Sequence, residues 1–115
     1  PVAAHRLNVD GTLHLLEFAR TMGDRLGRPV GFFFPSSVAA YGLPDADAKA
    51  RAGAVREDDF PHPATMYGVN KRYGEELGRY YDRHYRRLDP TPAAGRVDFR
   101  GLRYPGLLAA DSLPS

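Results

Sequence analysis

The stretch Val30-Gly31-Phe32-Phe33-Phe34-Pro35-Ser36-Ser37 indicates which class of fold the chain adopts. Its first five residues form an apolar run without a charge, and Val and Phe favour strands. A run that is apolar on both faces is typical of a buried strand in a parallel sheet. Small hydroxyl residues follow directly, where open α/β sheets bind ligands at the carboxyl ends of their strands. Ser36 and Ser37 are therefore candidate site residues, with the capping of a turn as the alternative role.

A long helix is expected before this strand, over residues 3–26. Gly11 interrupts it at a cost of about 1 kcal/mol relative to alanine, so we expect this glycine to mark a close contact. The Gly27-Arg28-Pro29 run is expected to end the helix. The apolar residues that recur near helical spacing, and so predict the packed face, are Leu7, Leu15, Phe18, Ala19, Met22 and Leu26.

A second helix is expected over residues 66–88, with Thr65 as its N-cap. Tyr67 and Lys71 lie one turn apart on it, in one strip with Gly74 and Gly78. Bare glycines allow another group to approach the helix backbone closely. The predicted core stripe beside this strip contains Val69, Tyr73, Leu77, Tyr80, His84 and Leu88. Taken alone, a surface tyrosine with a neighbouring lysine explains the first pair.

The remaining segments complete a parallel α/β arrangement. Residues 43–65 are rich in Asp, Ala and Pro and predict a long irregular segment. Residues 89–95 predict a break, residues 96–104 alternate as a second strand, and the tail over 107–115 predicts a loop. The order of helix, strand, loop, helix and strand predicts parallel strands with right-handed crossovers, in one partial domain over residues 1–115.

The composition excludes several classes of function. The 115 residues contain no cysteine, which excludes disulfides, thiolate zinc sites and cysteine nucleophiles and fits a cytoplasmic protein. No apolar run approaches the roughly 20 residues of a membrane span, and no signal peptide is visible. A net charge of +2 gives no argument for nucleic acid, and the four histidines lack metal-ligand spacing. We therefore expect no membrane, nucleic-acid or metal partner.

Four segments, in the right order, resemble the extended short-chain dehydrogenase/reductases of the NAD-dependent epimerase/dehydratase family. Residues 8–12 are similar to its Asn-Val-x-Gly-Thr helix, and residues 34–42 to its strand, catalytic hydroxyl and Tyr-Gly turn. Residues 67–71, with Gly74-Glu75, are similar to its Tyr-x-x-x-Lys helix, and residues 102–106 to the strand end that meets the nicotinamide. The resemblance implies part of a Rossmann-type, doubly wound parallel sheet in three α/β/α layers.

The family's glycine-rich dinucleotide fingerprint is not in this sequence, so we expect an internal piece that lacks the N-terminal glycine-rich unit. The preference for NAD over NADP is read by residues outside the chain. Within the family, residues 35–42 and 102–107 look most like the L-threonine 3-dehydrogenases. Nucleotide-sugar epimerases rank second, because they usually have Phe-Asn where this chain has Pro105-Gly106. A non-catalytic module with a degenerate dehydrogenase fold is the remaining alternative.

The resemblance implies oxidation of a secondary alcohol by hydride transfer to NAD. It assigns Tyr67 as general base, Ser37 as the group that orients the substrate oxygen, and Lys71 as a catalytic residue. A nearby cation lowers the pKa of a phenol, which gives the four-residue spacing a physical reason. Lys71 has a second possible partner in Glu75, at i,i+4. The implied cofactor-binding residues are Asn8, Ser36, Tyr67, Lys71, Tyr104 and Pro105.

Two further expectations follow from the resemblance. The substrate is a small molecule, either L-threonine or a nucleotide sugar. In the family, the helices that carry the residues corresponding to Asn8 and Tyr67 often build a dimer interface, so a homodimer is expected. The observation that separates catalysis from a surface tyrosine is whether Ser37, Tyr67 and Lys71 come together in space.

Overall fold

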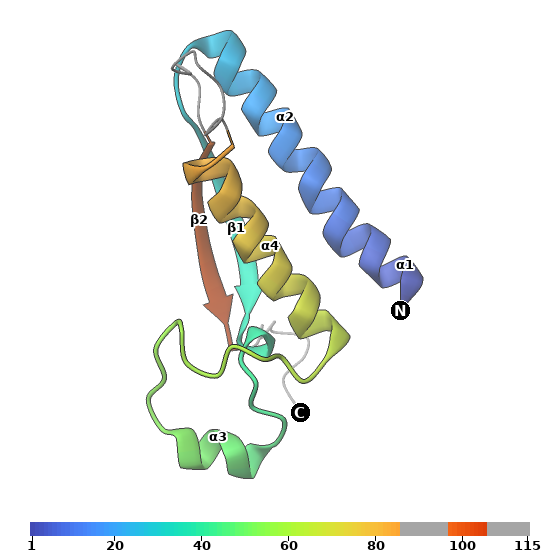
Figure 1. Cartoon of the computed structure of the whole chain (residues 1–115), viewed down its shortest axis with the longest axis vertical. Coiled ribbons are helices and arrows are strands. Elements are labelled where there is room, and N and C mark those ends of the chain that lie inside the picture. Colours follow the sequence, from blue (N-terminus) through green and yellow to red (C-terminus); the bar gives the residue numbers. More distant parts are fainter. Residues whose placement is uncertain (86–96, 106–115) are drawn as a thin grey trace, which may run out of the picture.

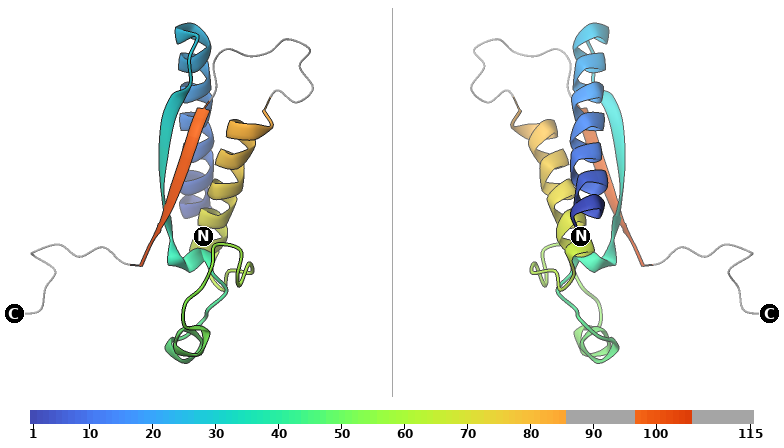
Figure 2. Two further views of the ribbon diagram at one scale, coloured as in Figure 1. Left: turned by 90° about the vertical axis from the view of Figure 1, so that its left-hand side faces the viewer. Right: turned by 90° about the vertical axis from the view of Figure 1, so that its right-hand side faces the viewer.

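The computed structural model describes residues 1–85 and 97–105, in which two parallel strands carry two long helices on one face (Figure 1). Figure 2 shows the strands on one side of the molecule and both helices on the other. The predicted α/β fold is confirmed, and this part of the chain supplies the sheet and one helical layer. In the described residues, no helix combines the length and apolar character needed to cross a membrane.

The strands β1 (Val30–Ser37) and β2 (Val97–Tyr104) pair in parallel, as predicted. The register runs from Val30 opposite Val97 to Ser37 opposite Tyr104. β1 is longer than the apolar run 30–34, because β2 continues the ladder to the last of these pairs. Both hydroxyl residues therefore belong to the strand itself rather than to the loop after it.

One helical rod forms the first 26 residues, close to the predicted range of 3–26. It consists of α1 (Val2–His5), a π-helical segment η1 (Arg6–Asp10) and α2 (Gly11–Leu26). Gly27 ends it in the left-handed conformation with φ 65°, as the sequence predicts. The close contact predicted at Gly11 is wrong, because a Cβ added there meets nothing within 4 Å among the described residues.

The face of α2 that packs on the sheet agrees with the predicted one at Ala19 but not at Leu15 and Phe18. Leu16, Ala19 and Gly23 are buried, whereas Leu15 and Phe18 are exposed. This helix is apolar on more than one side, so its periodicity could not select the side that meets the sheet. The core beneath α2 consists of Leu16, Ala19, Tyr81 and Val97.

The helix α4 (Met66–Arg83) begins where predicted, since the Thr65 side chain accepts a hydrogen bond from the Gly68 N–H at 3.0 Å. It ends earlier than the predicted residue 88, which lies outside the described residues. His84 leaves the helical conformation, with φ −127° and ψ −9°, and the Tyr85 ring stacks on Tyr81 at 4.8 Å. Packing of this ring on the helix accompanies the end of α4.

The glycine strip of α4 faces the sheet. A Cβ added at Gly74 would lie 2.4 Å from the Phe34 ring, and one at Gly78 would lie 2.0 Å from the Phe99 ring. The predicted close approach is therefore confirmed. The predicted core stripe is confirmed at Leu77, which packs against the core, but not at Tyr73 and Tyr80, which remain about half exposed. Two aromatic rings from the strands fill the space that the glycines leave, which turns the strip toward the sheet.

The segment predicted as irregular over 43–65 contains a helix, α3 (Ala46–Ala52). Asp45 caps it by accepting a hydrogen bond from the Ala48 N–H at 2.7 Å, and Gly53 follows with φ 61°. Alternating alanines between an acidic cap and a glycine are a helix signal that the irregular prediction overlooked. A single 3₁₀ turn, η2 (Val38–Ala40), connects β1 to this segment. The predicted break over 89–95 and the tail over 107–115 lie outside the described residues.

Candidate active site

The candidate site lies at the carboxyl ends of β1 and β2, against the first turns of α4 (Figure 1). η2 packs on the start of α4 so closely that a Cβ added at Gly68 would lie 2.0 Å from the Ala39 carbonyl oxygen. This contact brings the residues that follow Ser37 onto the turn that carries Tyr67. Ligands of open α/β sheets bind at this kind of edge.

Lys71 joins α4 to the end of β1. Its Nζ donates to the Pro35 carbonyl oxygen at 2.8 Å and lies 5.0 Å from the centre of the Phe34 ring. The same ammonium lies 5.6 Å from the centre of the Tyr67 ring. Partial burial lowers the pKa of the Lys71 ammonium. The cation is therefore held between the tyrosine and the strand that ends in Ser37, and its predicted pairing with Glu75 is not formed.

The two hydroxyls at the end of β1 have different surroundings. The Ser37 Oγ accepts a hydrogen bond from the Ala39 N–H at 3.1 Å, so this serine does cap the turn. Accepting that bond leaves its hydroxyl hydrogen able to donate to a ligand. Ser36 is 4% exposed and donates to Glu75 Oε1 at 2.5 Å. Its predicted contact with the cofactor stays a prediction.

The remaining predicted residues border the same region. Asn8 lies in η1, which packs against α4, and its carbonyl oxygen accepts a hydrogen bond from the Thr12 hydroxyl at 2.6 Å. π-helical segments inside α-helices often occur at functional sites. Tyr104 is the ladder partner of Ser37, and Pro105 follows it. The Lys71 ammonium thus lies near both Tyr67 and the end of β1, while the roles of the individual residues remain predictions.

Sequence reasoning missed a buried ion pair beside this site, between Glu75 and Arg103. The alternation of β2 contained the signal, because Arg103 shares the inward side of the strand with Val97, Phe99 and Gly101. A cation on a side that faces a helix needs a buried carboxylate. Glu75 supplies it from 28 residues away in the sequence, a pairing that no local pattern announces.

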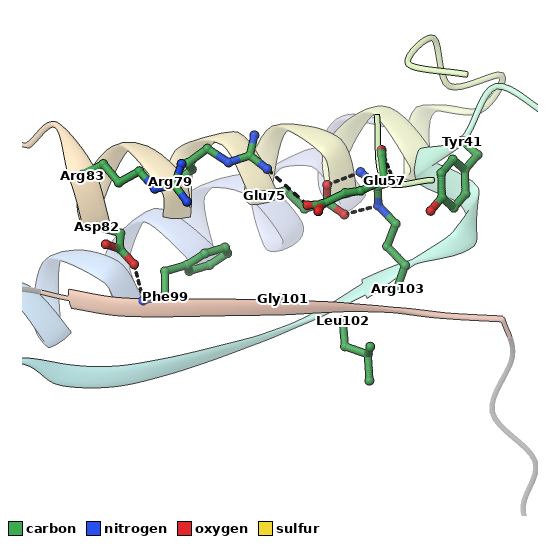
Figure 3. A pocket seen from close by; sticks show the side chains of 10 residues that line it. All are labelled: Tyr41, Glu57, Glu75, Arg79, Asp82, Arg83, Phe99, Gly101, Leu102 and Arg103. Atoms are coloured by element: carbon green, nitrogen blue, oxygen red, sulfur yellow. Dashed lines mark hydrogen bonds and ion pairs between the residues drawn. The ribbon is translucent and has the colours of Figure 1, made fainter. Parts of the chain in front are cut away.

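A cavity of about 360 Å³ lies next to this pair, between α4 and β2 (Figure 3). Glu75 and Arg103 line it together with Tyr41, Glu57 and Arg79, whereas Leu102 points to the opposite side of the strand. Tyr67, Lys71 and Ser37 do not line it. We therefore place the candidate site at the strand ends rather than in this cavity. In the described residues, no three His, Asp or Glu side chains gather in a way that could hold a metal ion.

A family model described as the NAD-dependent epimerase/dehydratase family matches residues 1–104. The chain belongs to this family. The family accounts for the Rossmann-type arrangement of parallel strands and covering helices. It is described as NAD-dependent, which fits a site at the carboxyl ends of the strands.

An uncharacterized epimerase/dehydratase of Staphylococcus aureus strain USA300 is 37% identical to the chain over 109 residues. The aligned region covers 95% of this chain and 27% of that protein. Uncharacterized epimerase/dehydratases of strains NCTC 8325 and MRSA252 have the same identity and coverage. The chain therefore spans 27% of the length of the curated relatives that it matches. No solved structure matches it significantly.

Proposed function

We propose that the protein containing this chain is an NAD-dependent oxidoreductase of the extended short-chain dehydrogenase type, with Tyr67 as its general base. One observation carries the proposal. The Lys71 ammonium lies 5.6 Å from the centre of the Tyr67 ring and 2.8 Å from a carbonyl oxygen of the strand that ends in Ser37. This contact supports the proposal because it holds a cation beside a phenol and against the strand that ends in Ser37, at the edge where open α/β sheets bind ligands.

The proposed reaction is the oxidation of a secondary alcohol. The Tyr67 phenolate takes the hydroxyl proton of the substrate, while a hydride leaves the carbon that bears this hydroxyl. NAD, when bound, accepts that hydride. The Lys71 ammonium lies beside the Tyr67 ring, and Ser37 donates its hydroxyl hydrogen to the substrate oxygen and orients it. The carbonyl oxygen of the product stays in contact with the Tyr67 and Ser37 hydroxyls.

The residues present fit the nicotinamide half of NAD. Lys71 and Tyr104 lie at the strand ends, and Asn8 lies in η1, which packs against α4. A cation, a phenol and an amide suit the hydroxyls and amide of a nicotinamide riboside. Pro105 adds a ring beside them. The pyrophosphate half needs a glycine-rich turn at a helix N-terminus. None of the 12 glycines lies two residues from another, so we expect the isolated chain to show negligible NAD affinity.

L-threonine is the first substrate that we propose, with 2-amino-3-ketobutyrate as product. The segment that ends in Pro105-Gly106 supports it, on the resemblance described above. A nucleotide sugar is the second candidate, supported by the epimerase/dehydratase description of the family and of the S. aureus relatives. Both substrates require the same alcohol oxidation, so Tyr67, Lys71 and Ser37 keep their roles in either case.

The test is turnover by the full-length protein. With NAD present, we expect L-threonine to produce NADH, and Ser37→Ala to lower the turnover number without changing NAD affinity. Conversion of UDP-sugars without NADH release would instead support a nucleotide sugar as the substrate, in place of L-threonine. Failure of both substrate classes, with NAD bound tightly, would contradict both substrate assignments.

We also propose that the full-length protein is a homodimer. Leu15 and Phe18 of α2 are 58% and 65% exposed, and Val69 and Tyr73 of α4 are 45% and 48% exposed. Apolar stripes on two neighbouring helices suit a four-helix contact with a second copy. Light scattering at micromolar concentration should give the mass of a dimer. A monomer mass that Phe18→Glu leaves unchanged would contradict the proposal.

A further inference from the structure

The ion pair between Glu75 and Arg103 is both buried and bidentate. Arg103 Nε donates to Glu75 Oε1 at 2.7 Å and Arg103 Nη2 donates to Oε2 at 2.6 Å. The two side chains are only 10% and 8% exposed. Figure 3 shows them meeting in the space between α4 and β2. Two parallel N–H···O bonds fix both the distance and the orientation of the two elements.

The glutamate end of this pair reaches the strand that ends in Ser37. Glu75 Oε1 accepts the hydrogen bond from Ser36, and one turn earlier on α4 Lys71 donates to the Pro35 carbonyl oxygen. Two residues at i,i+4 on one helix thus hold two consecutive residues of β1. Ser37 is the next residue, so its place relative to α4 is set by these two contacts.

The arginine end of the pair reaches the segment that follows the site. Arg103 Nη1 donates to the Glu57 carbonyl oxygen at 2.8 Å, and its guanidinium lies 4.5 Å from the centre of the Tyr41 ring. The Gly42 N–H donates to the Phe60 carbonyl oxygen at 2.7 Å, which ties the two ends of this segment together. Arg103 therefore holds Tyr41 and Glu57, near the two ends of this segment, beside the end of β2.

A contribution to the stability of the fold does not by itself explain this pair. Two charges taken out of water lose hydration that their mutual attraction barely repays, and an apolar pair of similar volume often does as well. Burial raises the pKa of the Glu75 carboxyl, but hydrogen bonds from Arg103 and Ser36 outweigh it and keep the pKa below its usual value. The pair therefore stays charged, and what it supplies is fixed geometry.

We propose that Glu75 and Arg103 are positioning residues, which set the place of Ser37 through Ser36 and the places of Tyr41 and Glu57 through Arg103. This inference deepens the proposed function and rests on it for the role of Ser37. It assigns different consequences to the two ends of the pair. Loosening the Ser36 end lowers the turnover number, and loosening the Arg103 end, which frees Tyr41 and Glu57 beside the strand ends, also raises the substrate KM.

Three variants of the full-length protein test this assignment. We expect Glu75→Gln to lower the turnover number by roughly 10-fold to 10²-fold, because a misplacement of about 1 Å costs up to 10²-fold. Ser36→Ala should lower it less, because it removes only one of the hydrogen bonds that Glu75 accepts. Arg103→Lys keeps the charge but loses the planar fork, so it should raise the substrate KM. If Glu75→Gln does not fold, Ser36→Ala and Arg103→Lys still test the two ends of the pair.

Matched controls and a second readout separate positioning from simple stabilisation. Glu76→Gln and Arg100→Lys change neighbouring residues on the same two elements, in ion pairs that are far more exposed. Hydrogen exchange of the ligand-free protein should accelerate at residues 36–42 and 54–58 in Glu75→Gln and Arg103→Lys, and stay unchanged in both controls.

Two outcomes would overturn the inference. One is exchange in these segments that matches the wild type. The other is faster exchange with wild-type turnover number and KM, which would leave the pair a purely structural contact. The proposed function fails by a different result, namely full activity of Tyr67→Phe, and the exchange measurement still shows whether the pair holds both segments.

Discussion

Tyr67 and Tyr81 stand on the same helix, about four turns apart, in opposite electrostatic surroundings. Tyr67 is 48% exposed and has the Lys71 ammonium beside its ring. Tyr81 is 7% exposed and donates its hydroxyl hydrogen to the Glu17 carboxylate. Burial and then this carboxylate raise the pKa of Tyr81 well above its usual value. A tyrosine beside a carboxylate stays a neutral donor, whereas one beside a cation suits proton abstraction.

The two halves of α4 differ in the same way. The first half contacts the strand ends through polar groups, as in Lys71 to Pro35 and Glu75 to Ser36. The second half packs apolar and aromatic groups, with Tyr81 against the core beside Leu16 and Val97. One helix thus separates the end that carries the proposed site from a structural end, and substitutions at the two ends should affect different measurements.

The largest effect is expected at Tyr67. Tyr67→Phe removes the hydroxyl and keeps the ring, and general acid–base groups typically contribute 10²–10⁴-fold to turnover. Turnover of the full-length protein should fall by roughly that factor, while its NAD affinity, measured by calorimetry, stays nearly constant. Loss of NAD affinity as well would indicate a binding rather than a catalytic role.

Lys71→Met should have the next largest effect and should act on two measurements. Removing the ammonium takes away a proposed ribose contact, so the NAD dissociation constant should rise. It also removes the cation that lies 5.6 Å from the centre of the Tyr67 ring, so turnover should fall as well. Calorimetry with NAD and steady-state turnover check the two effects, and an unchanged turnover would separate Lys71 from the proton transfer.

At the structural end, Gly78→Ala should destabilise the fold. The added Cβ would lie 2.0 Å from the Phe99 ring, and overpacking of this kind typically costs about 1–3 kcal/mol. Gly11→Ala is the control, since its Cβ meets nothing within 4 Å in the described residues and alanine favours a helix. Urea unfolding of the two variants should therefore shift in opposite directions.

Tyr81→Phe should cost less. It removes one hydrogen bond to a carboxylate that remains partly exposed, which is worth about 1 kcal/mol. Turnover should be unchanged, because Tyr81 lies at the opposite end of α4 from the strand ends. Thermal unfolding and turnover of the same preparation provide the check, and a loss of turnover would break the separation between the two halves.

The smallest effect is expected from acid. The hydrogen bond from Tyr81 and the contacts of Arg20 lower the pKa of Glu17 despite its burial, and Arg103 and Ser36 lower that of Glu75. A carboxyl with a lowered folded pKa adds stability above its unfolded pKa of about 4.3 and loses it as pH falls through the folded value. At pH values below about 4, the melting temperature should therefore decrease, and the decrease should be smaller in Glu75→Gln.

Local signals in the sequence predicted most of the fold. Thr65 caps α4, Gly27 ends α2, and the apolar run that begins at Val30 forms a parallel strand, because each signal acts over a few residues. The faces that pack could not be predicted in the same way. α2 and α4 both carry apolar residues on two sides, and the sheet aromatics that selected the glycine strip lie far away in the sequence.

In the candidate site, too, local patterns predicted some features and missed one long-range contact. The Tyr67–Lys71 spacing and the serines after β1 are local patterns, and the sequence was enough to single them out. The pairing of Glu75 with Arg103 joins residues 28 positions apart, and the local spacing offered only Lys71 as a possible partner of Glu75. Lys71 bonds to Pro35, because the strand register brings that carbonyl oxygen to it.

The most direct test is to compare the turnover of Tyr67→Phe and Tyr81→Phe in the full-length protein, with the same substrate and with folding of both variants verified. The two substitutions remove the same atom from the same helix. The proposed chemistry predicts that Tyr81→Phe keeps wild-type turnover and that Tyr67→Phe falls about 10²–10⁴-fold below it. Equal turnover for the two variants would show that Tyr67 is a surface residue and contradict the proposed role of this site.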